Sequence, residues 1–475
     1  MRSIDKVYID GKFISPHGTE TSDLFNPSTQ EKIGTVILGD VEDARAAVAS
    51  AKRAFPAFTL SSKSERIDML KRLSAAVSAR SAELTDAMAE EYGSPQYFTG
   101  FAVPHAASAF LNMAAVLETY EFTRRIGNAE VVMQPVGVAA AITPWNSNYG
   151  FICTKMATAI AAGTTIVIKP SEMSAIQTQI LTECLHAAGL PDGVFNIVNG
   201  RGDVVGAELS RHPDIAKVTF TGSTAVGKDI MRAGVDTLKR VTLELGGKGP
   251  NIVLDDADLN TVIPTVLAMG LGNSGQACVA GTRILIPEAR IDEALARLKE
   301  EITAFKTGSP HDPNVRVGPM VSDKQYERVQ SYIRVGLEEG AKLVAGGLGR
   351  PEGIDKGWFS RPTIFANVRN DMRIAREEIF GPVLSVITYR DDEDAIRIAN
   401  DTNYGLQAYL HGRDTARLHA IASRLDSGRV VINGAPHEPL APFGGFKQSG
   451  IGREYGEYGL EGFLEPKAIL SVGAN

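Results

Sequence analysis

The residues whose types and spacing best suit chemistry in this chain are a glutamate and a cysteine, Glu244 and Cys278. Each lies in a stretch that contains glycine, LELGGK at 243–248 and GQAC at 275–278, so both side chains are expected on turns. An ionised thiol attacks an electrophilic carbon, and a carboxylate prepares water for hydrolysis of the product. This pair therefore predicts covalent catalysis followed by a hydrolytic step.

A third candidate lies upstream, in the tripeptide Pro144-Trp145-Asn146. The side-chain amide of Asn146 can donate a hydrogen bond to an oxyanion, and loss of one such donor typically lowers a rate about 100- to 1000-fold. An ordinary thiol has a pKa of about 8.5, so little of it is ionised at neutral pH. Backbone amides around Cys278 are therefore expected to favour the thiolate.

The composition narrows the class of protein. A chain of 475 residues with 44% hydrophobic and 22% charged residues predicts a soluble globular protein of two or three domains. The net charge of −7 disfavours a nucleic-acid partner. Cys153, Cys184 and Cys278 show neither metal-ligand spacing nor a disulfide framework. With no apolar leader and no expected membrane span, a cytoplasmic protein without metal, membrane or nucleic-acid partner is expected.

Strands and helices are expected to alternate from about residue 135 onward. The pattern predicts strands at 136–142, 165–168, 194–198 and 217–220, with helices at 150–162 and 174–188 between them. A second series is predicted later, with helices at 391–400 and 414–425 and strands at 406–411 and 428–432. Such alternation indicates parallel βαβ units, so the predicted fold class is α/β with two doubly wound layers and the chemistry between them.

The part before residue 135 predicts other elements. Alternating apolar residues around Asp10-Gly11 predict a tight hairpin over 7–14. Apolar residues at helical spacing from Ile67 to Met88 predict an amphipathic helix for which Gly93 is a suitable end. These elements are expected to build the core and carry no chemistry.

Two glycine motifs compete as the binding site for a dinucleotide. The literal GxGxxG at 270–275 is rejected, because a helical run precedes it and a strand follows, whereas the fingerprint requires strand, turn and then helix. The motif at 222–227 follows a strand and opens a helix through Met231, so its free amides can face a pyrophosphate. The alternative is a plain tight turn between strand and helix.

Lys169 and Glu172 close another strand at the carboxyl edge, where α/β proteins bind nucleotides. A carboxylate here would accept hydrogen bonds from a ribose diol and repel a 2′-phosphate, which favours NAD over NADP. The alternative is a solvent-exposed strand end followed by a helix that Ser171 caps.

With these segments in order, the chain resembles the aldehyde dehydrogenase superfamily over essentially its whole length. Seven motifs in the family's order carry the resemblance: 144–146 (PWN), 169–172 (KPSE), 220–223 (FTGS), 243–248 (LELGGK), 275–278 (GQAC), 378–383 (EIFGPV) and 442–445 (PFGG).

The resemblance implies roles for single residues. Cys278 would be the nucleophile, Glu244 the general base, and Asn146 would form the oxyanion hole with the backbone amide of Cys278. Lys155 and Glu454 match positions that some members use to relay protons, although a structural ion pair is the alternative. The residues implied in cofactor binding are Trp145, Lys169, Glu172, Gly222, Ser223, Glu378 and Phe380.

The resemblance also implies an activity and a domain plan. The activity is NAD(P)-dependent oxidation of an aldehyde through a thiohemiacetal and a thioester on Cys278, with NAD as cofactor and NADP as the alternative. The plan is an NAD-binding domain over 1–116 and 136–247, a catalytic domain over 248–448, and a small β oligomerisation arm. The arm would comprise 117–135 and 453–475 and pair subunits into a homo-oligomer, either a dimer or a tetramer.

Three other functions are alternatives for a chain with a reactive cysteine, and the residues present count against each of them. A CoA-acylating dehydrogenase resolves the thioester with a thiol and needs no general base, so Glu244 counts against it. A thiol hydrolase without a cofactor needs a base such as histidine near the cysteine, and no histidine has a suggestive neighbourhood. A non-enzymatic relative would be expected to lose the cysteine or the glutamate, and both are present.

The substrate is the least constrained part of the prediction. By resemblance, its tunnel would be lined by Ser147, Gly150, Phe151, Thr154, His437 and Phe443. Small or polar residues, among them Asn148, predict a roomy and polar passage that favours a medium-sized or aromatic aldehyde. His437 is expected either as a solvated loop residue or in contact with a polar substrate tail. No arginine is evident in these stretches, so a clamp for a carboxylate tail is not expected.

Overall fold

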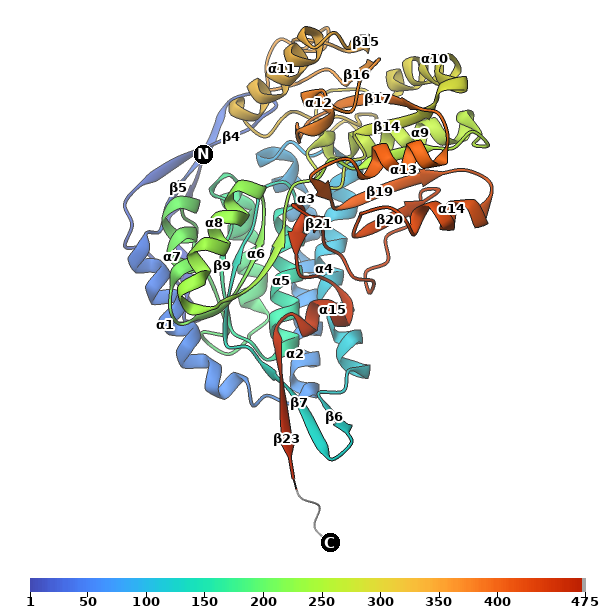
Figure 1. The fold of residues 1–475 in the computed structure, drawn as a ribbon. Coiled ribbons are helices and arrows are strands. Elements are labelled where there is room, and N and C mark those ends of the chain that lie inside the picture. Colours follow the sequence, from blue (N-terminus) through green and yellow to red (C-terminus); the bar gives the residue numbers. More distant parts are fainter. Residues whose placement is uncertain (472–475) are drawn as a thin grey trace.

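Two large β-sheets organise the structure, a computed structural model that describes residues 1–471 (Figure 1). The first sheet has eight strands in the order β22-β12-β11-β8-β9-β10-β2-β3. Its parallel centre consists of β12 (Arg240–Glu244), β11 (Ile215–Thr221), β8 (Val138–Ile142), β9 (Ile166–Lys169) and β10 (Phe195–Ile197). The antiparallel edges are β2 (Val7–Ile9) and β3 (Lys12–Ile14) on one side and β22 (Gly450–Ile451) on the other.

The strand order of this sheet reverses between β8 and β11. The chain runs from β8 outward through β9 and β10, then returns to the other side of β8 to form β11 and β12. At such a reversal, the loops that follow the two adjacent strands lead to opposite sides of the sheet. A crevice therefore opens at the carboxyl edge, and doubly wound proteins bind their ligands in it. The reversal therefore marks the expected position of a ligand.

The second sheet has seven strands in the order β15-β16-β17-β14-β13-β19-β20. They are β15 (Lys342–Ala345), β16 (Thr363–Ala366), β17 (Val383–Tyr389), β14 (Arg283–Pro287), β13 (Pro250–Val253), β19 (Gln407–His411) and β20 (Arg429–Ile432). All neighbours pair in parallel except β15 with β16. The predicted α/β class with two mainly parallel sheets is confirmed.

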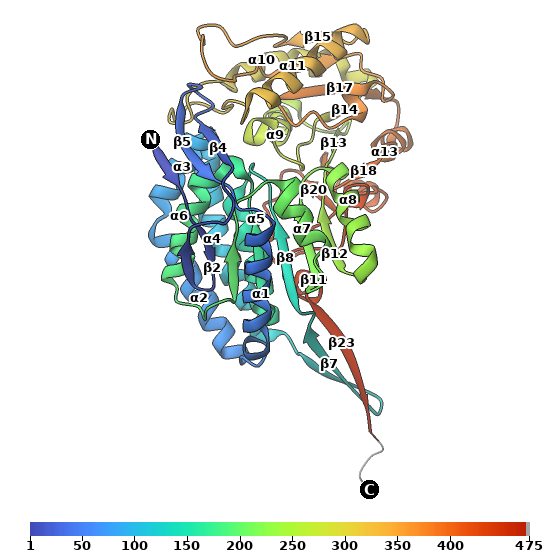
Figure 2. The same ribbon diagram turned by 90° about the vertical axis from the view of Figure 1, so that its left-hand side faces the viewer.

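A three-stranded sheet extends away from the body of the molecule (Figure 2). It has the order β23-β7-β6, with β6 (Thr123–Ile126), β7 (Ala129–Pro135) and β23 (Leu464–Leu470), all antiparallel. Residues 130–134 and 468–472 also read as strands in the sequence; the first lies within β7, and β23 ends at Leu470, before Ser471, while Val472 lies outside the described residues. A further small sheet near the N-terminus joins β1 (Arg2–Ile4), β5 (Lys32–Ile37) and β4 (Thr21–Phe25).

Helices cover both large sheets and follow the predictions closely. Those around the first sheet are α1 (Val41–Phe58), α2 (Lys63–Ala79), α3 (Ser81–Glu91), α4 (Gln96–Thr119), α5 (Asn148–Ala162), α6 (Ala175–Ala187), α7 (Ala207–Arg211) and α8 (Thr224–Gly234). Those of the later part are α9 (Leu259–Leu271), α10 (Ile291–Glu301), α11 (Asp323–Glu338), α12 (Arg373–Arg376), α13 (Asp392–Asn400), α14 (Thr415–Ala422) and α15 (Gly456–Glu461). The helix predicted over 414–425 ends three residues early, at Ala422.

The prediction of one helix from Ile67 to Met88 is wrong. Arg80 leaves helical geometry (φ −114°, ψ 23°) and separates α2 from α3. The apolar positions Leu70, Leu73, Val77, Leu84 and Met88 are nevertheless all fully buried. The break preserves the buried stripe, so hydrophobic spacing alone could not reveal it.

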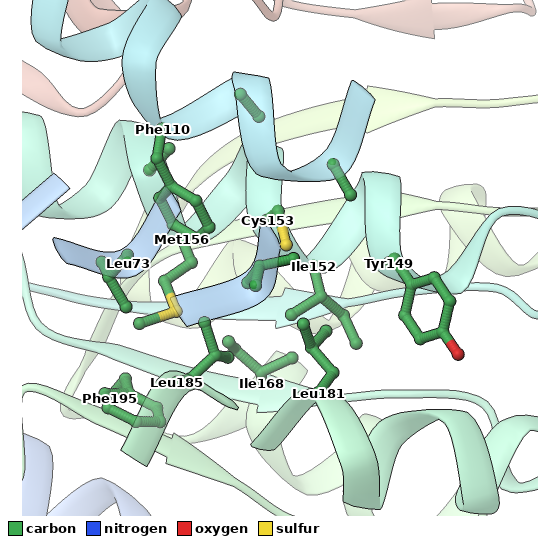
Figure 3. Close-up of a cluster of buried hydrophobic side chains, with 14 of the residues drawn as sticks. Leu73, Phe110, Tyr149, Ile152, Cys153, Met156, Ile168, Leu181, Leu185 and Phe195 are labelled. Atoms are coloured by element: carbon green, nitrogen blue, oxygen red, sulfur yellow. The ribbon is translucent and has the colours of Figure 1, made fainter. Parts of the chain in front are cut away.

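The largest core lies between the first sheet and helices α2 to α6. Leu73, Phe110, Ile152 and Met156 meet side chains of β9 and α6 there (Figure 3). Cys153 and Cys184 belong to this cluster, and burial raises the pKa of both thiols. Both cysteines are therefore packing residues.

Helix α4 bears on the expectation that no segment spans a membrane, without overturning it. It is uncharged over most of its length and is long and apolar enough to cross a bilayer. However, 56% of its most apolar window is buried inside the protein, where it packs on α2 and α5. A core helix of a soluble protein has the same properties, so this helix is weak evidence for a membrane.

Candidate active site

Two adjoining cavities open where the strand order of the first sheet reverses. The larger, about 620 Å³, is lined by residues that include Thr143, Lys169, Glu172 and Val226. The smaller, about 350 Å³, is lined by Trp145, Asn146, Phe151, Ser223, Glu244, Leu245, Gly246, Cys278, Lys324, Gln325, Arg328, Glu378 and Phe380. Both cavities include Pro144, Thr221 and Gly222, so they form one continuous cleft. The cleft unites all three predicted catalytic residues with all seven predicted cofactor residues.

The segment that carries Cys278 is held in an unusual backbone conformation. Asn273, Ser274 and Gly275 have φ angles of 52°, 59° and 71°, the left-handed region that non-glycine residues seldom adopt. Ser274 Oγ accepts a 2.8 Å hydrogen bond from the Gly318 amide, and Gln276 Oε1 accepts one of 3.0 Å from Val321. Such conformations persist only where the surroundings fix them, so the nucleophile has a firmly defined position.

Glycine at 247 permits the two catalytic segments to touch. A Cβ atom at Gly247 would lie 2.1 Å from the carbonyl oxygen of Cys278, a distance no side chain can occupy. The amide of Gly247 also donates to Glu378 Oε1 at 2.9 Å. This close backbone approach links three of the motifs from the sequence.

The rejection of the GxGxxG motif at 270–275 is confirmed. Its first residues end helix α9, and strand β14 follows at Arg283, so the order is not strand, turn and helix.

Cys278 is protonated in this environment. Burial, and then the negative charges of Glu378 and Glu244, raise the pKa of its thiol to about 12, against smaller opposing effects of a backbone hydrogen bond and of Arg429. The thiol is half-buried and lines the smaller cavity. Ionisation therefore requires added positive charge or the loss of a neighbouring negative charge.

Glu244 is the last residue of β12, and its carboxyl group is buried. Neither oxygen accepts a hydrogen bond from any residue in the described part of the chain. Burial raises the pKa of this carboxyl well above its ordinary value, the nearby charge of Glu454 raises it too, and Lys155 opposes both. A carboxyl group with a raised pKa is a stronger base in its ionised form, which suits it to take a proton from water.

A buried polar network lies behind Glu244. The Lys155 ammonium donates to Glu454 Oε1 and to Thr219 Oγ1, the latter at 3.1 Å. Lys217 donates to Thr242 Oγ1 at 2.7 Å, and burial together with the charge of Lys155 lowers the pKa of Lys217 to about 7. Lys155 and Glu454 thus form an ion pair, which was the alternative to a proton relay. Their charges also act on the pKa of Glu244, in opposite directions.

Asn146 reaches the catalytic segment directly. Its side-chain Nδ2 donates to the backbone carbonyl of Gln276 at 2.9 Å. The backbone carbonyl of Asn146 accepts from Asn273 Nδ2 at 3.0 Å. An amide nitrogen carries two hydrogens, so one remains for a ligand in the cavity. The asparagine is therefore positioned against the nucleophile.

The predicted cofactor residues cap helices or pair with one another, which was the alternative interpretation, and they also line the cleft. Ser223 caps α8 by accepting from the Val226 amide at 3.4 Å, and Ser171 caps the turn after β9. Lys169 pairs with Glu172 at 3.2 Å, and burial lowers the pKa of the Lys169 ammonium. Ser223 and the pair Lys169 and Glu172 nevertheless line the cleft.

At the other end of the cleft, an aromatic pair and a carboxyl group meet. The Trp145 and Phe380 rings pack edge to face with centroids 5.5 Å apart. Burial raises the pKa of the Glu378 carboxyl to about 7.

The predicted tunnel residues divide into two groups. Phe151 lines the smaller cavity, but the other five do not. Phe443 and His437 instead form an aromatic cluster with Tyr455, whose ring centroid lies 5.8 Å from Phe443 and 5.4 Å from His437. Ser147 and Gly150 lie together at the start of α5, since a Cβ on Gly150 would lie 3.0 Å from Ser147 Oγ.

One proposed feature of the tunnel is wrong. Asn148 does not make the passage polar, because it is fully buried and donates to Thr178 Oγ1 at 3.1 Å. At the start of a helix, one residue's difference in position changes which face a side chain occupies, and sequence alone did not fix that face.

Some residues of the site are not predicted by any motif in the sequence. Lys324, Gln325 and Arg328 approach the smaller cavity from α11, and no motif marks them. Arg429 lies against His437 and Phe443, so the absence of an arginine near the predicted tunnel is corrected. The signal in the sequence that could have indicated Arg429 is a charged residue at the start of the otherwise apolar strand Arg429–Ile432.

Among residues 1–471, no group of histidine, cysteine or acidic side chains has the geometry to hold a metal ion.

Comparison with known proteins places this geometry in a family. The model of the family described as "Aldehyde dehydrogenase family" matches residues 13–469. A 3-succinoylsemialdehyde-pyridine dehydrogenase from a Pseudomonas species is 43% identical over 99% of both chains.

Solved structures agree with this. A variant of aldehyde dehydrogenase C from Pseudomonas syringae, in complex with NAD+ and octanal, has a TM-score of 0.97 and 42% identity, with 98% of this chain and 96% of that chain covered. An aldehyde dehydrogenase from Mycobacterium tuberculosis, in complex with NAD+, has a TM-score of 0.96 and 40% identity, with 99% and 98% covered. With the cleft, its thiol and its carboxyl group already in place, these matches show that the chain belongs to the aldehyde dehydrogenase family.

Proposed function

We propose that this enzyme oxidises an aldehyde to a carboxylic acid with NAD+, using Cys278 as the nucleophile and Glu244 as the base for hydrolysis. The observation that carries the proposal is the single cleft in which thiol, carboxyl and Asn146 amide meet at the strand reversal. The NAD+ complexes of the relatives from P. syringae and M. tuberculosis support it.

The residues of the cleft fit NAD+. Lys169 and Glu172 would hold the adenosine ribose, and the free amides at the start of α8, beside Gly222 and Ser223, would face the pyrophosphate. Glu378 would hold the nicotinamide ribose, with Trp145 and Phe380 packing beside it. Bound NAD+ supplies the hydride acceptor. The Glu172 carboxylate opposes a 2′-phosphate, so NAD+ is the favoured cofactor and NADP+ the alternative.

The chemistry of the protein groups has two stages. Cys278 gives its proton to a water molecule and its sulfur bonds to the aldehyde carbon, while the carbonyl π electrons move to the oxygen, which accepts from Asn146 Nδ2 and the Cys278 amide. Once hydride has left that carbon, a thioester to Cys278 remains. Glu244 then takes a proton from water, the water oxygen bonds to the carbonyl carbon, and the carbon–sulfur bond breaks to release the acid. Lys155 and Glu454 would carry the proton onward.

The test is oxidation without CoA. Purified protein with NAD+ and a panel of aliphatic, aromatic and acidic aldehydes should produce NADH and the matching carboxylic acid in equal amounts. A requirement for CoA would establish the acylating alternative. Ester hydrolysis with no NADH would establish a thiol hydrolase, although His437, a candidate base, is already engaged by Arg429 through Nδ1.

The expected size of the substrate rests on the resemblance, which implies a passage beside the small residues Gly150 and Thr154, although only Phe151 of the predicted tunnel lines the smaller cavity. We therefore expect medium-sized or aromatic aldehydes to react faster than acetaldehyde. A strict preference for acetaldehyde in the same panel would refute a roomy passage.

Assembly and domain plan complete the proposal. The arm of β6, β7 and β23 carries exposed apolar residues, including Ile126 at 66% and Leu470 at 72% exposure. Its outer strands expose unpaired backbone edges, which a closed oligomer would cover. We expect a homodimer or homotetramer by light scattering. The division at residues 116, 136, 247 and 448 is likewise proposed.

A further inference from the structure

Arg429 is fixed beside the aromatic cluster by contacts on three sides. Its Nε donates to Gln407 Oε1 at 2.6 Å, and its Nη1 donates to His437 Nδ1 at 2.9 Å. Its guanidinium lies over the Phe443 ring, 4.9 Å from the centroid. A side chain held in this way has a defined orientation, so its remaining hydrogen-bonding groups have one too.

The positive charge of Arg429 has no partner of opposite charge. The guanidinium forms no ion pair with any residue between 1 and 471, and its Nη2 donates to none of them. Burial lowers the pKa of Arg429, although arginine remains protonated in proteins. Its charge acts on both Cys278 and Glu244. A half-buried, uncompensated cation therefore lies near the nucleophile.

His437 provides a second unused donor. Because a guanidinium can only donate, Nδ1 of His437 must accept, so the proton of the neutral ring is on Nε2. Burial, and then the charge of Arg429, lowers the pKa of His437 to about 4, so the ring is neutral at pH 7. Its Nε2 is buried and has no hydrogen-bond partner among the described residues. Buried donors without partners are uncommon in native proteins.

A hydrogen-bonded chain ties this pair to the catalytic segment. Gln407, which accepts from Arg429, donates through Nε2 to the Tyr409 hydroxyl. That hydroxyl donates to the carbonyl of Val279 at 2.8 Å, in the residue that follows the nucleophile. The unpaired cation and donor are thus built onto the wall that carries Cys278.

We propose that Arg429 and His437 form a subsite for the carboxylate tail of an aldehyde substrate, and that the enzyme selects aldehydes bearing such a tail. The subsite rests on the proposed function, since it places the tail of the same molecule whose carbonyl carbon meets Cys278. A carboxylate accepts from two donors at once and compensates the charge of Arg429. A neutral apolar tail leaves both donors unpaired, and sites of this kind reject such analogues.

The experiment compares two substrates of equal shape, 4-carboxybenzaldehyde and 4-formylbenzamide, in NADH formation with saturating NAD+. The wild-type enzyme should show a higher kcat/KM for the carboxylate. In Arg429→Met, the ratio of carboxylate to amide should fall about 10- to 100-fold, the range for a hydrogen bond to a charged group, mainly through KM for the carboxylate. In Arg429→Lys, which keeps the charge without the planar donor pair, the ratio should be intermediate.

A matched control is Arg424→Met, an exposed arginine in the same part of the chain that pairs with Glu393. It should leave the ratio unchanged. Equal losses for both substrates in Arg429→Met would overturn the subsite and assign Arg429 to the ionisation of Cys278. A wild-type preference for the amide would overturn it as well.

A measurement on the wild-type protein avoids dependence on the folding of a variant. Benzoate should slow the alkylation of Cys278 by iodoacetamide at concentrations where benzamide does not, and equal protection by both would contradict the subsite. If no aldehyde yields NADH while benzoate still protects, the proposed function fails and the anion subsite stands. If aldehydes are oxidised with no preference for a carboxylate, the subsite alone fails.

Discussion

The cofactor side and the substrate side of the cleft are built in different ways. On the cofactor side, the binding groups follow consecutive strand ends, so Trp145, Lys169 and Ser223 meet because β8, β9 and β11 are adjacent. On the substrate side, α5, β20 and the loop before Phe443 each contribute one or two side chains. The cofactor side is thus fixed by the strand order, whereas the substrate side depends on contacts among side chains from separate elements.

The largest expected effect is the loss of turnover when the nucleophile is removed, because Cys278 serves the chemistry and neither the cofactor side nor the substrate side of the cleft. Cys278→Ala should lower turnover by at least about 10,000-fold, since removal of a nucleophile costs that order in comparable enzymes. Binding of NAD+, measured by calorimetry, should be unchanged because the cofactor residues lie on other strands. Turnover that survives the substitution would require another nucleophile.

Removal of the base should divide the reaction into its two stages. Glu244→Gln keeps the size of the buried side chain but cannot take a proton, so steady-state turnover should fall about 100- to 10,000-fold. Rapid mixing should still show a first burst of NADH equal to the enzyme concentration. If the burst disappears together with the steady state, Glu244 acts before the thioester forms.

The ionisation of the Cys278 thiol with pH tests how the charged groups of the cleft act on the nucleophile. Because the pKa of Cys278 is raised to about 12, the thiolate fraction of the free enzyme should rise with pH throughout the range 7 to 10, about tenfold per unit. The rate of alkylation by iodoacetamide should follow it. Glu244→Gln removes a charge that raises this pKa and should speed alkylation at a given pH. A plateau below pH 9 would contradict the raised pKa.

The smallest expected effect concerns cofactor choice. Glu172→Gln removes the charge that opposes a 2′-phosphate and should raise the kcat/KM ratio of NADP+ to NAD+ about tenfold, a modest charge interaction near the surface. Steady-state kinetics with both cofactors measures it. An unchanged ratio would place Glu172 away from the ribose and leave it as the partner of Lys169.

The difference between the two sides also explains how far the sequence could predict the molecule. Strand and helix periodicity located β8 to β11 within a few residues, and strand order then places their ends together. Glycine-rich motifs marked Cys278 and Glu244 because close backbone contact, such as that of Gly247 with Cys278, tolerates no side chain.

What escaped prediction depends on which face a side chain occupies. Asn148 is buried against Thr178 and not in the passage, and the break at Arg80 left the buried stripe of α2 and α3 intact. Arg429 opens β20 and His437 lies eight residues later, but their contact, and that of Arg429 with Phe443, depends on how the chain turns after this strand. Local patterns carry no information on such contacts.

The most direct test of the central claim is to trap the acyl-enzyme. Glu244→Gln protein mixed with NAD+ and an aldehyde, quenched in acid and digested, should carry the mass of the acyl group on the peptide that contains Cys278. The label should be absent when NAD+ is omitted. An acyl group on any other side chain, or none after a full burst of NADH, would contradict thioester formation at Cys278.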